Sequence, residues 1–565
     1  MTHIKSFLQE IKVELEAIKE GNKSHYKLEK HYIFDHTTKL CTPFRVKARA
    51  YDRNRANMSF LIEVLTTDGH IVEVLVRNDL LISAPPKALG EMGNRGWIIY
   101  GEKKVVAELI SLWPVKEHHK IATTLGWNNE DYFALTNGQV LKAPGFTSEV
   151  VLESQTTNKT KGTLEGWRRK IGQKARGNPY LMFACSAALT GPLLPFAPTV
   201  KSFAVHFYHH TSTGKSTLLR VAEGLWPRPE NPNLKTWRAT GNALEGWLVK
   251  ANNTVLCVDE LPKEQAKRAF ADDIYMFGNE KGKGRADKDG TTKTTNNWQV
   301  ILLSAGELSG AQMLKASGEK NSGGQEVRWL DIPVNAPHGV FHELHGAAHG
   351  RSFVDALSQQ SNEEFGNVGP EFVKSLMNDP FLREGFEAAL EGYFKKLNQA
   401  LNISEALQGE IPRIMRQFAL IVLAGEHASS MGITGWQRGD ALEAVKHVAR
   451  QWYDAQDRSI SATLRIHLDE ISKYLSRLSP EQKCSHEAGK DHLKPEVVKV
   501  WYTNDEYDFT KDALNEVSNG SAVEWAKFLD SQNILIRAKS GSLQKRLSFG
   551  PRNRVYRMSR SAIDR

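Results

Sequence analysis

The sequence is poor in cysteine and contains no long uninterrupted apolar run. Its 565 residues include four cysteines, none spaced as a disulfide pair, so a disulfide-stapled secreted domain is disfavoured and a reducing cytosol is expected. Residues 1–20 carry charges throughout, which argues against a secretory signal peptide. The one apolar span of near-membrane length, residues 180–198, contains Pro192 and Pro195, so we expect a buried helix and a turn there. A cytoplasmic protein without membrane contact is the expectation.

Internal repeats and long low-complexity segments are also missing. Cys484, His486 and His492 lie close together, but a fourth ligand is missing nearby, so we expect a solvated loop rather than a metal site. The apolar content of 40% and the charged content of 25% are ordinary for globular proteins. The length predicts three or four domains.

The stretch His209-His-Thr-Ser-Thr-Gly-Lys-Ser216 is the most informative part of the chain. It lies between an apolar run at 202–207 and a helical pattern at 217–226, which is the strand–loop–helix context of a phosphate-binding loop. Backbone N–H groups of such a loop surround phosphate oxygens, Lys215 reaches the β- and γ-phosphates, and the Ser216 hydroxyl binds Mg²⁺. The first position holds His209 where glycine is usual, so we expect a differently shaped entrance. ATP and Mg²⁺ are the predicted cofactors, held by Thr211, Ser212, Thr213, Gly214, Lys215, Ser216 and Thr217.

An apolar strand pattern at 254–258 ends in two carboxylates, Asp259 and Glu260. Downstream of a phosphate-binding loop, Asp259 is placed to hold Mg²⁺ and Glu260 to polarise the attacking water. A surface loop that happens to be acidic is the alternative. The combination of the two motifs predicts an ATPase.

Two further positions are candidates for catalysis. The apolar run at 298–303 ends at Ser304, and in ring ATPases the strand next to the acidic one ends in a polar residue, called sensor 1, that orients the water. A simple strand end is the alternative. Arg328 precedes another strand pattern at 329–334, so it is a candidate arginine finger for the γ-phosphate of a neighbouring subunit. A solvent-exposed arginine is the alternative there.

A basic insertion, residues 282–293, lies between the acidic pair and Ser304. Its Asp289-Gly290 pair predicts a hairpin turn. In a hexameric ring a hairpin at this place points into the central pore, where Arg285, Lys288 and Lys293 would grip DNA phosphates. A flexible surface loop is the alternative.

The end of the chain is strongly basic. Residues 537–565 hold nine Lys or Arg and one acid, so they carry +8 of the net charge of +9. Two short helical patterns, 510–519 and 522–531, precede two basic strand patterns, which together predict a winged helix that binds the nucleic-acid backbone. A winged helix for protein contacts is the alternative. The candidate DNA-binding residues are Lys545, Arg546, Arg552 and Arg554.

The coarse organisation is α/β. Residues 1–150 alternate apolar and polar in short runs, as at 59–66 and 70–76, and predict a β-rich N-terminal collar with some helix. Residues 151–199 are expected to be a helical linker, and 200–340 a core with a parallel sheet. Helical periodicity over 350–460, as at 412–430 and 439–457, predicts a helical lid at 341–460. The winged-helix domain is expected at 461–565.

Several blocks resemble the signature of one family, domain of unknown function 927. They are Gly126-Trp127, residues 237–245, 258–261, 282–285, 303–307, 324–328 and 416–426, and Gly435-Trp436. The resemblance covers about residues 40–460 and implies an AAA+ ATPase similar to superfamily 3 and minichromosome maintenance helicases. It also implies a place on bacterial mobile elements, phages and their satellites, as in staphylococcal cassette replicative helicases. Arg413 or Arg416 matches the place of a sensor 2 arginine, and priming has to come from a separate primase or replisome protein.

The expectation is therefore a hexameric, ATP-driven DNA helicase that replicates a mobile element and translocates on DNA through its pore. Two other functions stay open. One is a DNA-dependent ATPase that melts or loads an origin without processive unwinding. The other is a P-loop regulator that binds nucleotide and partner proteins without unwinding.

Overall fold

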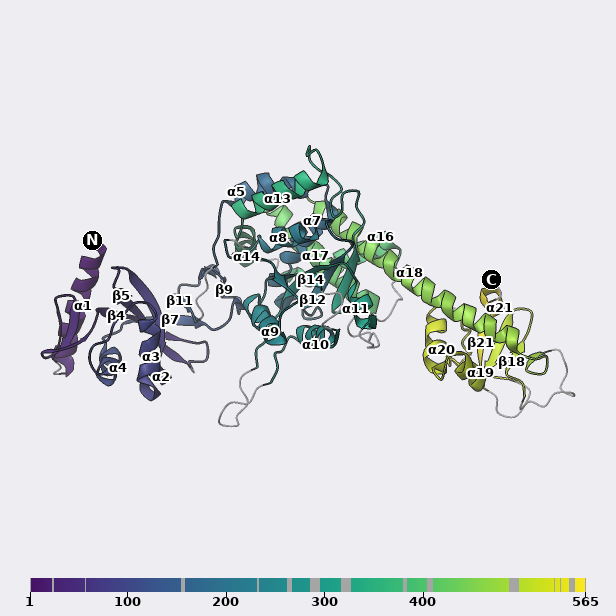
Figure 1. Cartoon of the computed structure of the whole chain (residues 1–565), viewed down its shortest axis with the longest axis horizontal. Coiled ribbons are helices and arrows are strands. Elements are labelled where there is room, and N and C mark those ends of the chain that lie inside the picture. The colour runs from purple at the N-terminus through teal and green to yellow at the C-terminus, as the bar shows by residue number, and fades with distance from the viewer. Residues whose placement is uncertain are drawn as a thin grey trace. The chain divides into compact units, whose positions relative to one another are not determined.

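The computed structural model describes most of the chain, in two compact units, Met1–Trp452 and Tyr453–Arg565 (Figure 1). The described residues are 2–22, 25–55, 57–153, 158–230, 233–261, 267–284, 295–316, 327–379, 384–403, 410–486, 497–532, 534–538, 540–547 and 554–563. Within these ranges no helix combines the length and the apolar character that a membrane span requires.

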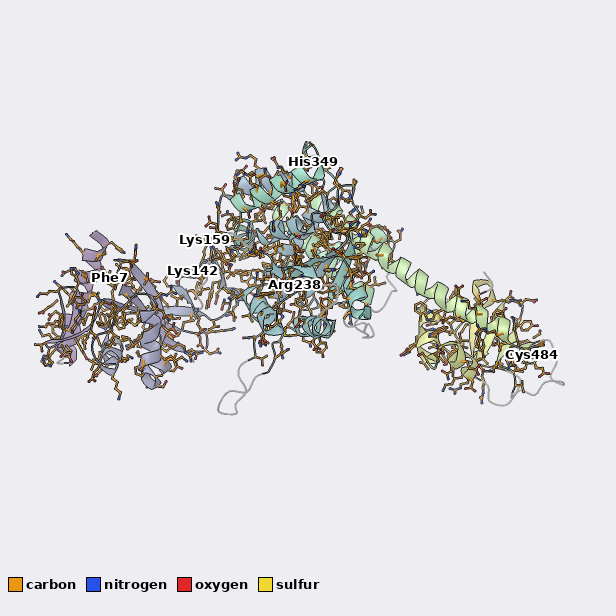
Figure 2. The ribbon with its side chains drawn as sticks, viewed as in Figure 1. Phe7, Lys142, Lys159, Arg238, His349 and Cys484 are labelled. Atoms are coloured by element: carbon orange, nitrogen blue, oxygen red, sulfur yellow. The ribbon has the colours of Figure 1, made fainter. Side chains whose placement is uncertain are left out.

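The N-terminal part is rich in β-structure, as the alternating runs predict. A helix α1 (Thr2–Asn22) precedes an antiparallel sheet of β1 (Tyr26–Glu29), β2 (Tyr32–Asp35) and β3 (Thr38–Cys41). A second sheet has the order β11-β7-β4-β5-β6, formed by Val150–Leu152, Glu117–Ala122, Phe44–Tyr51, Met58–Leu65 and Ile71–Arg77. Helices α2 (Asn78–Ser83), α3 (Pro85–Gly93) and α4 (Lys103–Leu112) follow β6. Some helix is expected in this region without a stated position, and α1 is one such helix: its buried stripe of Phe7 (Figure 2), Ile11, Leu15 and Ile18 has helical spacing.

Short elements lead into the central part of the first unit. Strands β8 (Gly126–Asn128), β9 (Tyr132–Ala134) and β10 (Val140–Lys142) form a small antiparallel sheet. The helical segments α5 (Leu164–Trp167), η1 (Arg168–Gly172), α6 (Gln173–Ala175), α7 (Pro179–Ala188) and η2 (Gly191–Phe196) follow. Residues 180–188 of α7 are buried throughout, so the apolar span is a core helix followed by a turn, as expected.

A five-stranded parallel sheet forms the centre of the first unit. Its order is β13-β14-β15-β12-β16, made of Lys235–Thr236, Val255–Leu261, Ile301–Gly306, Phe203–Tyr208 and Trp329–Pro333. Helices α8 (Lys215–Glu223), α9 (Gly241–Lys250), α10 (Lys267–Gly278) and α11 (Gly310–Ala316) alternate with these strands. The nearly continuous burial of β12 and β15 is what a parallel sheet covered on both faces requires. Since all strands run the same way, their carboxyl ends share one edge.

Helices predominate after residue 350. They are α13 (Gly350–Glu363), α14 (Val368–Asn378), α16 (Phe386–Leu401), α17 (Glu410–Ser430) and α18 (Asp440–Arg477). Helix α13 packs on α8, and α17 packs on α7 and α16. The helices expected as a lid therefore share the compact unit of the sheet, and α18 continues through the predicted domain boundary at 460.

The second unit contains the expected helix pair and basic hairpin. Helices α19 (Lys511–Val517) and α20 (Ala522–Ser531) are joined through a turn with positive φ at Asn519 and Gly520. Strands β20 (Lys545–Arg546) and β21 (Arg554–Ser559) pair antiparallel, and α21 (Arg560–Ile563) follows. Three strands that the sequence analysis missed extend the sheet in the order β17-β18-β19-β21-β20: Lys483–Ser485, Val500–Tyr502 and Glu506–Thr510.

Cys484 corrects one expectation in this unit. It lies buried in β17 rather than in a solvated loop, and burial raises the pKa of its thiol. His486 bonds to Asp508 through Nε2 at 3.1 Å, while His492 lies outside the described residues. No cluster of potential metal ligands occurs in the part of the chain that the structure describes.

Candidate functional site

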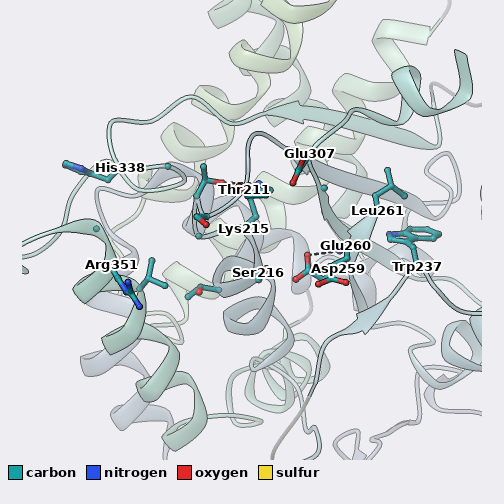
Figure 3. Close-up of a pocket in the computed structure, with 18 of the residues that line it drawn as sticks. Thr211, Lys215, Ser216, Trp237, Asp259, Glu260, Leu261, Glu307, His338 and Arg351 are labelled. Atoms are coloured by element: carbon teal, nitrogen blue, oxygen red, sulfur yellow. Dashed lines mark hydrogen bonds between the residues drawn. The ribbon is translucent and has the colours of Figure 1, made fainter. Parts of the chain in front are cut away.

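A cleft of about 1700 Å³ opens at the carboxyl edge of the parallel sheet (Figure 3). Residues 211–217, which are the end of the loop between β12 and α8 and the first turn of α8, line it together with the ends of β14 and β15. Segments 237–239 and 338–339 and the first turns of α13 complete the wall. The cleft therefore collects the predicted phosphate-binding loop and the predicted acidic pair at one place.

Close contacts with a neighbouring segment hold the loop in shape. Gly214 has φ +87°, and a Cβ there would lie 2.8 Å from the Phe341 ring, so this position requires glycine. The backbone N–H of Val340 donates to the Thr213 carbonyl at 2.9 Å. Helix α8 begins at Lys215, so its first N–H groups face the cleft and are available to an anion.

Lys215 is bound by its own loop. Its Nζ donates to the carbonyls of His209 at 2.9 Å and His210 at 2.7 Å, and to Oγ1 of Thr213 at 3.0 Å. The residue is 8% exposed, and burial lowers the pKa of its ammonium, against the opposing effect of Asp259 and Glu307. The loop thus presents a cation held by three neutral oxygens, which a phosphate oxygen is able to replace.

His209 at the first loop position introduces no backbone strain. Unlike Ser212, which has φ +61°, His209 is not among the residues with positive φ. Glycine is needed at such a position only where φ is positive, so a histidine fits here. Its ring packs edge-on against His210 at 5.0 Å, and burial lowers its pKa.

Asp259 and Glu260 both line the cleft because β14 is irregular there. Successive side chains of a regular strand point to opposite faces. The pairing of β14 with β15 shifts between Val258 and Leu261, which is a β-bulge, and Glu260 has φ +56°. The backbone N–H of Glu260 donates to Oδ1 of Asp259 at 2.9 Å. The two carboxylates and the exposed Ser216 hydroxyl offer the hard oxygen donors that Mg²⁺ prefers, so the residues fit this ion.

Ser304 does not reach the cleft, which corrects its assignment as sensor 1. Its side chain is fully buried, and its hydroxyl bonds to Nδ1 of His206 at 3.0 Å and to Nε1 of Trp237 at 2.9 Å. Its strand, β15, lies next to β14, the strand of the acidic pair, as expected, but β15 continues to Gly306. Glu307, the next residue, lines the cleft and is the polar group at the end of this strand.

Arg328 lies at the opposite edge of the sheet. Ala204 pairs with Trp329, so Arg328 precedes the first residues of the strands, about 17 Å from the carboxyl edge for a five-residue strand. Its Nη2 donates to Oδ1 of Asn279 at 3.0 Å, and its guanidinium lies 5.5 Å from the ring centre of exposed Tyr275. Arg328 therefore does not reach the cleft of its own chain.

Arg416 is also not at the cleft. It lies on α17 and pairs with Glu387 and, at 3.3 Å, with Glu391, both on α16. Neither Arg416 nor Arg413 belongs to the cleft wall, so this placement does not support either as sensor 2. The arginines that line the cleft are Arg238 and Arg351, which the sequence analysis missed.

Comparison with known proteins gives one family. The family model for a domain of unknown function, DUF927, matches residues 15–297, which is half of the chain. The chain belongs to the DUF927 family. No curated protein matches it.

This DUF927 member is similar in fold to a solved structure described as an SCCmec type IV Cch, active helicase. The TM-score is 0.67 and the identity is 16%, over 96% of this chain and 99% of that one. The likeness therefore extends over both units of the DUF927 protein.

Of the predicted DNA-binding residues of the DUF927 protein, three lie in the part of the chain that the structure describes. Arg285, Lys288, Lys293 and Arg552 lie outside the described residues. Arg546 on β20 and Arg554 on β21 are both exposed and directly opposite each other across the strand pair. Lys545 pairs with Val555 beside them.

Other basic residues of the tail are structural. Nε of Arg557 donates to the buried Asp508 at 2.8 Å, and Nε of Arg537 donates to Asp530 at 2.8 Å. Arg560 donates to the Thr503 carbonyl at 2.9 Å. The charge available to a ligand is therefore smaller than the net charge of the tail suggests.

Proposed function

We propose that the protein is an ATP-driven DNA helicase of the AAA+ class that works as a hexameric ring. The observation that carries the proposal is the meeting of the 211–217 loop, the acidic pair and Glu307 in one cleft at the carboxyl edge of a parallel sheet. The likeness to a structure described as an active helicase, over nearly the full length of both chains, supports the DNA-unwinding role.

The residues of the cleft divide the work of hydrolysis. The N–H groups at the start of α8 and Lys215 bind the phosphates, and Ser216 with Asp259 would hold Mg²⁺. An Mg²⁺ ion held by these residues would neutralise charge on the β- and γ-phosphates. Glu260 accepts a proton from the attacking water, and Glu307 orients that water beside it.

Arg328 supports a ring because it is too far from its own cleft. Tyr275 of α10 and Asn279, which directly follows α10, hold its guanidinium, and no ion pair of Arg328 with an acid is found among the described residues. In a ring it reaches the γ-phosphate bound by the next subunit and stabilises charge in the transition state.

The basic insertion is proposed as the DNA grip of the pore, through Arg285, Lys288 and Lys293. Asn296, just after the insertion, is tied to α9, because its Nδ2 donates to the buried Glu245 at 2.9 Å. The carbonyl of Asn296 accepts from the N–H of Gly282, the first residue of the insertion, at 2.8 Å. Helix α9 begins at Gly241, two residues after the cleft-lining segment 237–239. Through α9, a change in the bound nucleotide would be passed from the cleft to the insertion.

The second unit is proposed as a winged-helix domain that binds the DNA backbone. Like charges directly opposite each other in a strand pair destabilise it, so Arg546 and Arg554 favour an anion between them. A phosphate of the DNA backbone is such an anion, and Lys545 and Arg552 would extend the contact. We place the protein in the bacterial cytoplasm, replicating a mobile element with a separate primase.

Two experiments separate this function from its alternatives. ATP hydrolysis that is stimulated by single-stranded DNA is expected, and its absence together with nucleotide binding would favour a P-loop regulator. Displacement of a strand from a forked duplex is also expected. Stimulated hydrolysis without displacement would favour an origin-melting or loading ATPase.

A further inference from the structure

One wall of the cleft lies across the loop from the acidic pair. The residues of this wall have no role in the proposed hydrolysis of ATP. In Figure 3, Asp259, Glu260 and Glu307 lie on one side of Lys215 and Ser216, and His338 and Arg351 lie on the other. This second wall consists of His338, Gly339, Gly350, Arg351, Val354 and Asp355.

The second wall is fixed to the phosphate-binding loop by two contacts. Phe341, which lies under Gly214, packs edge-on against Phe353 of α13 with ring centres 4.9 Å apart. Further along α13, Oγ of Ser358 lies 3.3 Å from Oγ1 of Thr217. The two contacts lie on either side of Val354 and Asp355, so the first turns of α13 have a defined position beside the loop.

The direction of a bound triphosphate follows from the catalytic residues, and the inference rests on the proposed ATPase function. The γ-phosphate has to lie near Glu260, because the water attacks there. The β- and α-phosphates then follow the start of α8 away from the acids. The nucleoside leaves the loop on the side of His338 and α13.

Arg351 is suited to a planar ligand. No hydrogen bond or ion pair to Arg351 is found among the described residues, and its side chain is exposed at the cleft. A guanidinium is planar and stacks on aromatic faces, whereas the ammonium of a lysine contacts such a face without planar overlap. Val354 adds apolar surface in the same helix, and Asp355 adds an acceptor suited to ribose hydroxyls.

We infer that this second wall is the nucleoside subsite, in which the Arg351 guanidinium stacks on the base of the bound nucleotide. Arg351 then contributes to affinity for the base and not to the phosphates. The subsite lies on α13, and neither Arg413 nor Arg416 of α17 takes part in it.

Binding of two probes to the full-length protein with Mg²⁺ tests the inference. ADP carries the base, while inorganic tripolyphosphate reports the phosphate loop alone. Titration calorimetry on the wild type, Arg351→Ala and Arg351→Lys is expected to show about tenfold weaker ADP binding in both variants. Tripolyphosphate is expected to bind all three proteins equally. Gln359→Ala, on the same helix but outside the cleft wall, is the matched control and is expected to bind both probes as the wild type does.

Three outcomes overturn the inference. Equal loss of ADP and tripolyphosphate binding in Arg351→Ala would make Arg351 a phosphate ligand. Full ADP affinity in Arg351→Lys would exclude stacking, and full affinity in Arg351→Ala would exclude any contact. Failure of the wild type to bind either probe would refute the ATPase proposal itself, which is a distinct result.

Discussion

Trp237 donates from Nε1 to the hydroxyl of Ser304 at 2.9 Å, in the core directly behind the wall of the cleft. Ser304 in turn bonds to Nδ1 of His206, and Nε2 of His206 lies 2.9 Å from the Leu308 carbonyl. Because a carbonyl only accepts, Nε2 carries the proton and Nδ1 accepts from Ser304. The chain of bonds fixes the position of Trp237, and it explains why Ser304 has a structural role.

A substitution of Ser304 is expected to lower stability but not activity, and a substitution of Glu307 is expected to lower activity but not stability. Ser304→Ala leaves Trp237 and His206 without their buried partner, so it lowers the free energy of unfolding by about 2 kcal/mol. Hydrolysis by the folded fraction stays within a few-fold of the wild type. Glu307→Gln leaves stability unchanged and lowers kcat by about 10²-fold. Urea denaturation and steady-state ATPase assays measure both, and the reverse pattern would restore Ser304 as the sensor.

Arg328→Ala is expected to abolish hydrolysis through the neighbouring subunit. Loss of an arginine finger costs about 10³-fold or more in kcat. Lys215→Ala is inactive for a different reason, since it lacks the phosphate contact in its own cleft. Mixing the two inactive proteins is expected to restore part of the ATPase, at interfaces that join an intact cleft to an intact Arg328. A mixture that stays inactive although rings form would show that Arg328 does not act in trans.

Acid is expected to destabilise the first unit. Burial lowers the pKa of His206, and the same direction holds for His342, His427 and His447. These groups stay neutral in the folded chain and take up protons near pH 6.5 when unfolded, so stability is complete above this pH and falls below it. Urea midpoints at pH 7.5 and 5.5 measure the loss. His206→Gln is expected to show a smaller loss than the wild type, and an equal loss would exclude a contribution from His206.

The cross-strand pair of Arg546 and Arg554 is expected to set the salt dependence of DNA binding. Replacing both by alanine removes about two phosphate contacts. The slope of the logarithm of the DNA-binding constant against the logarithm of the salt concentration therefore becomes less negative by about 1.8. Arg537→Ala, whose guanidinium is paired with Asp530, is the matched control and leaves the slope unchanged. Fluorescence anisotropy with duplex DNA measures the slopes. An unchanged slope in the double variant would point to a protein-contact role for this unit.

Local patterns predicted the elements of the site well. The apolar runs at 202–207 and 254–258 are strands β12 and β14, and the loop and acidic pair at their ends line the cleft together. Parallel strands share a carboxyl edge, so this meeting follows from strand direction alone. The helix pair and hairpin of the second unit also have strong local signals, in Asn519-Gly520 and the alternating basic residues.

Side-chain partners explain what the sequence did not reveal. A polar residue in a strand reaches the edge only if the strand ends there, and β15 continues two residues past Ser304. A helical arginine such as Arg416 faces whichever helix packs on it, here the acids of α16, and nothing in its own helix indicates this. The contact of the loop with Phe341 depends on a segment more than a hundred residues away. Arg351 likewise lies more than a hundred residues beyond the loop, so its place at the cleft does not follow from the local sequence.

Strand displacement by the wild type and by Glu260→Gln tests the central claim most directly. A forked DNA duplex with one labelled strand is incubated with protein, Mg²⁺ and ATP. The wild type is expected to release the strand only with ATP. Glu260→Gln is expected to bind ATP with wild-type affinity, because Lys215 and Asp259 are intact, yet to hydrolyse it at least 10²-fold more slowly and release no strand. Displacement by Glu260→Gln at the wild-type rate, or no displacement by the wild type under any of these conditions, would contradict the account.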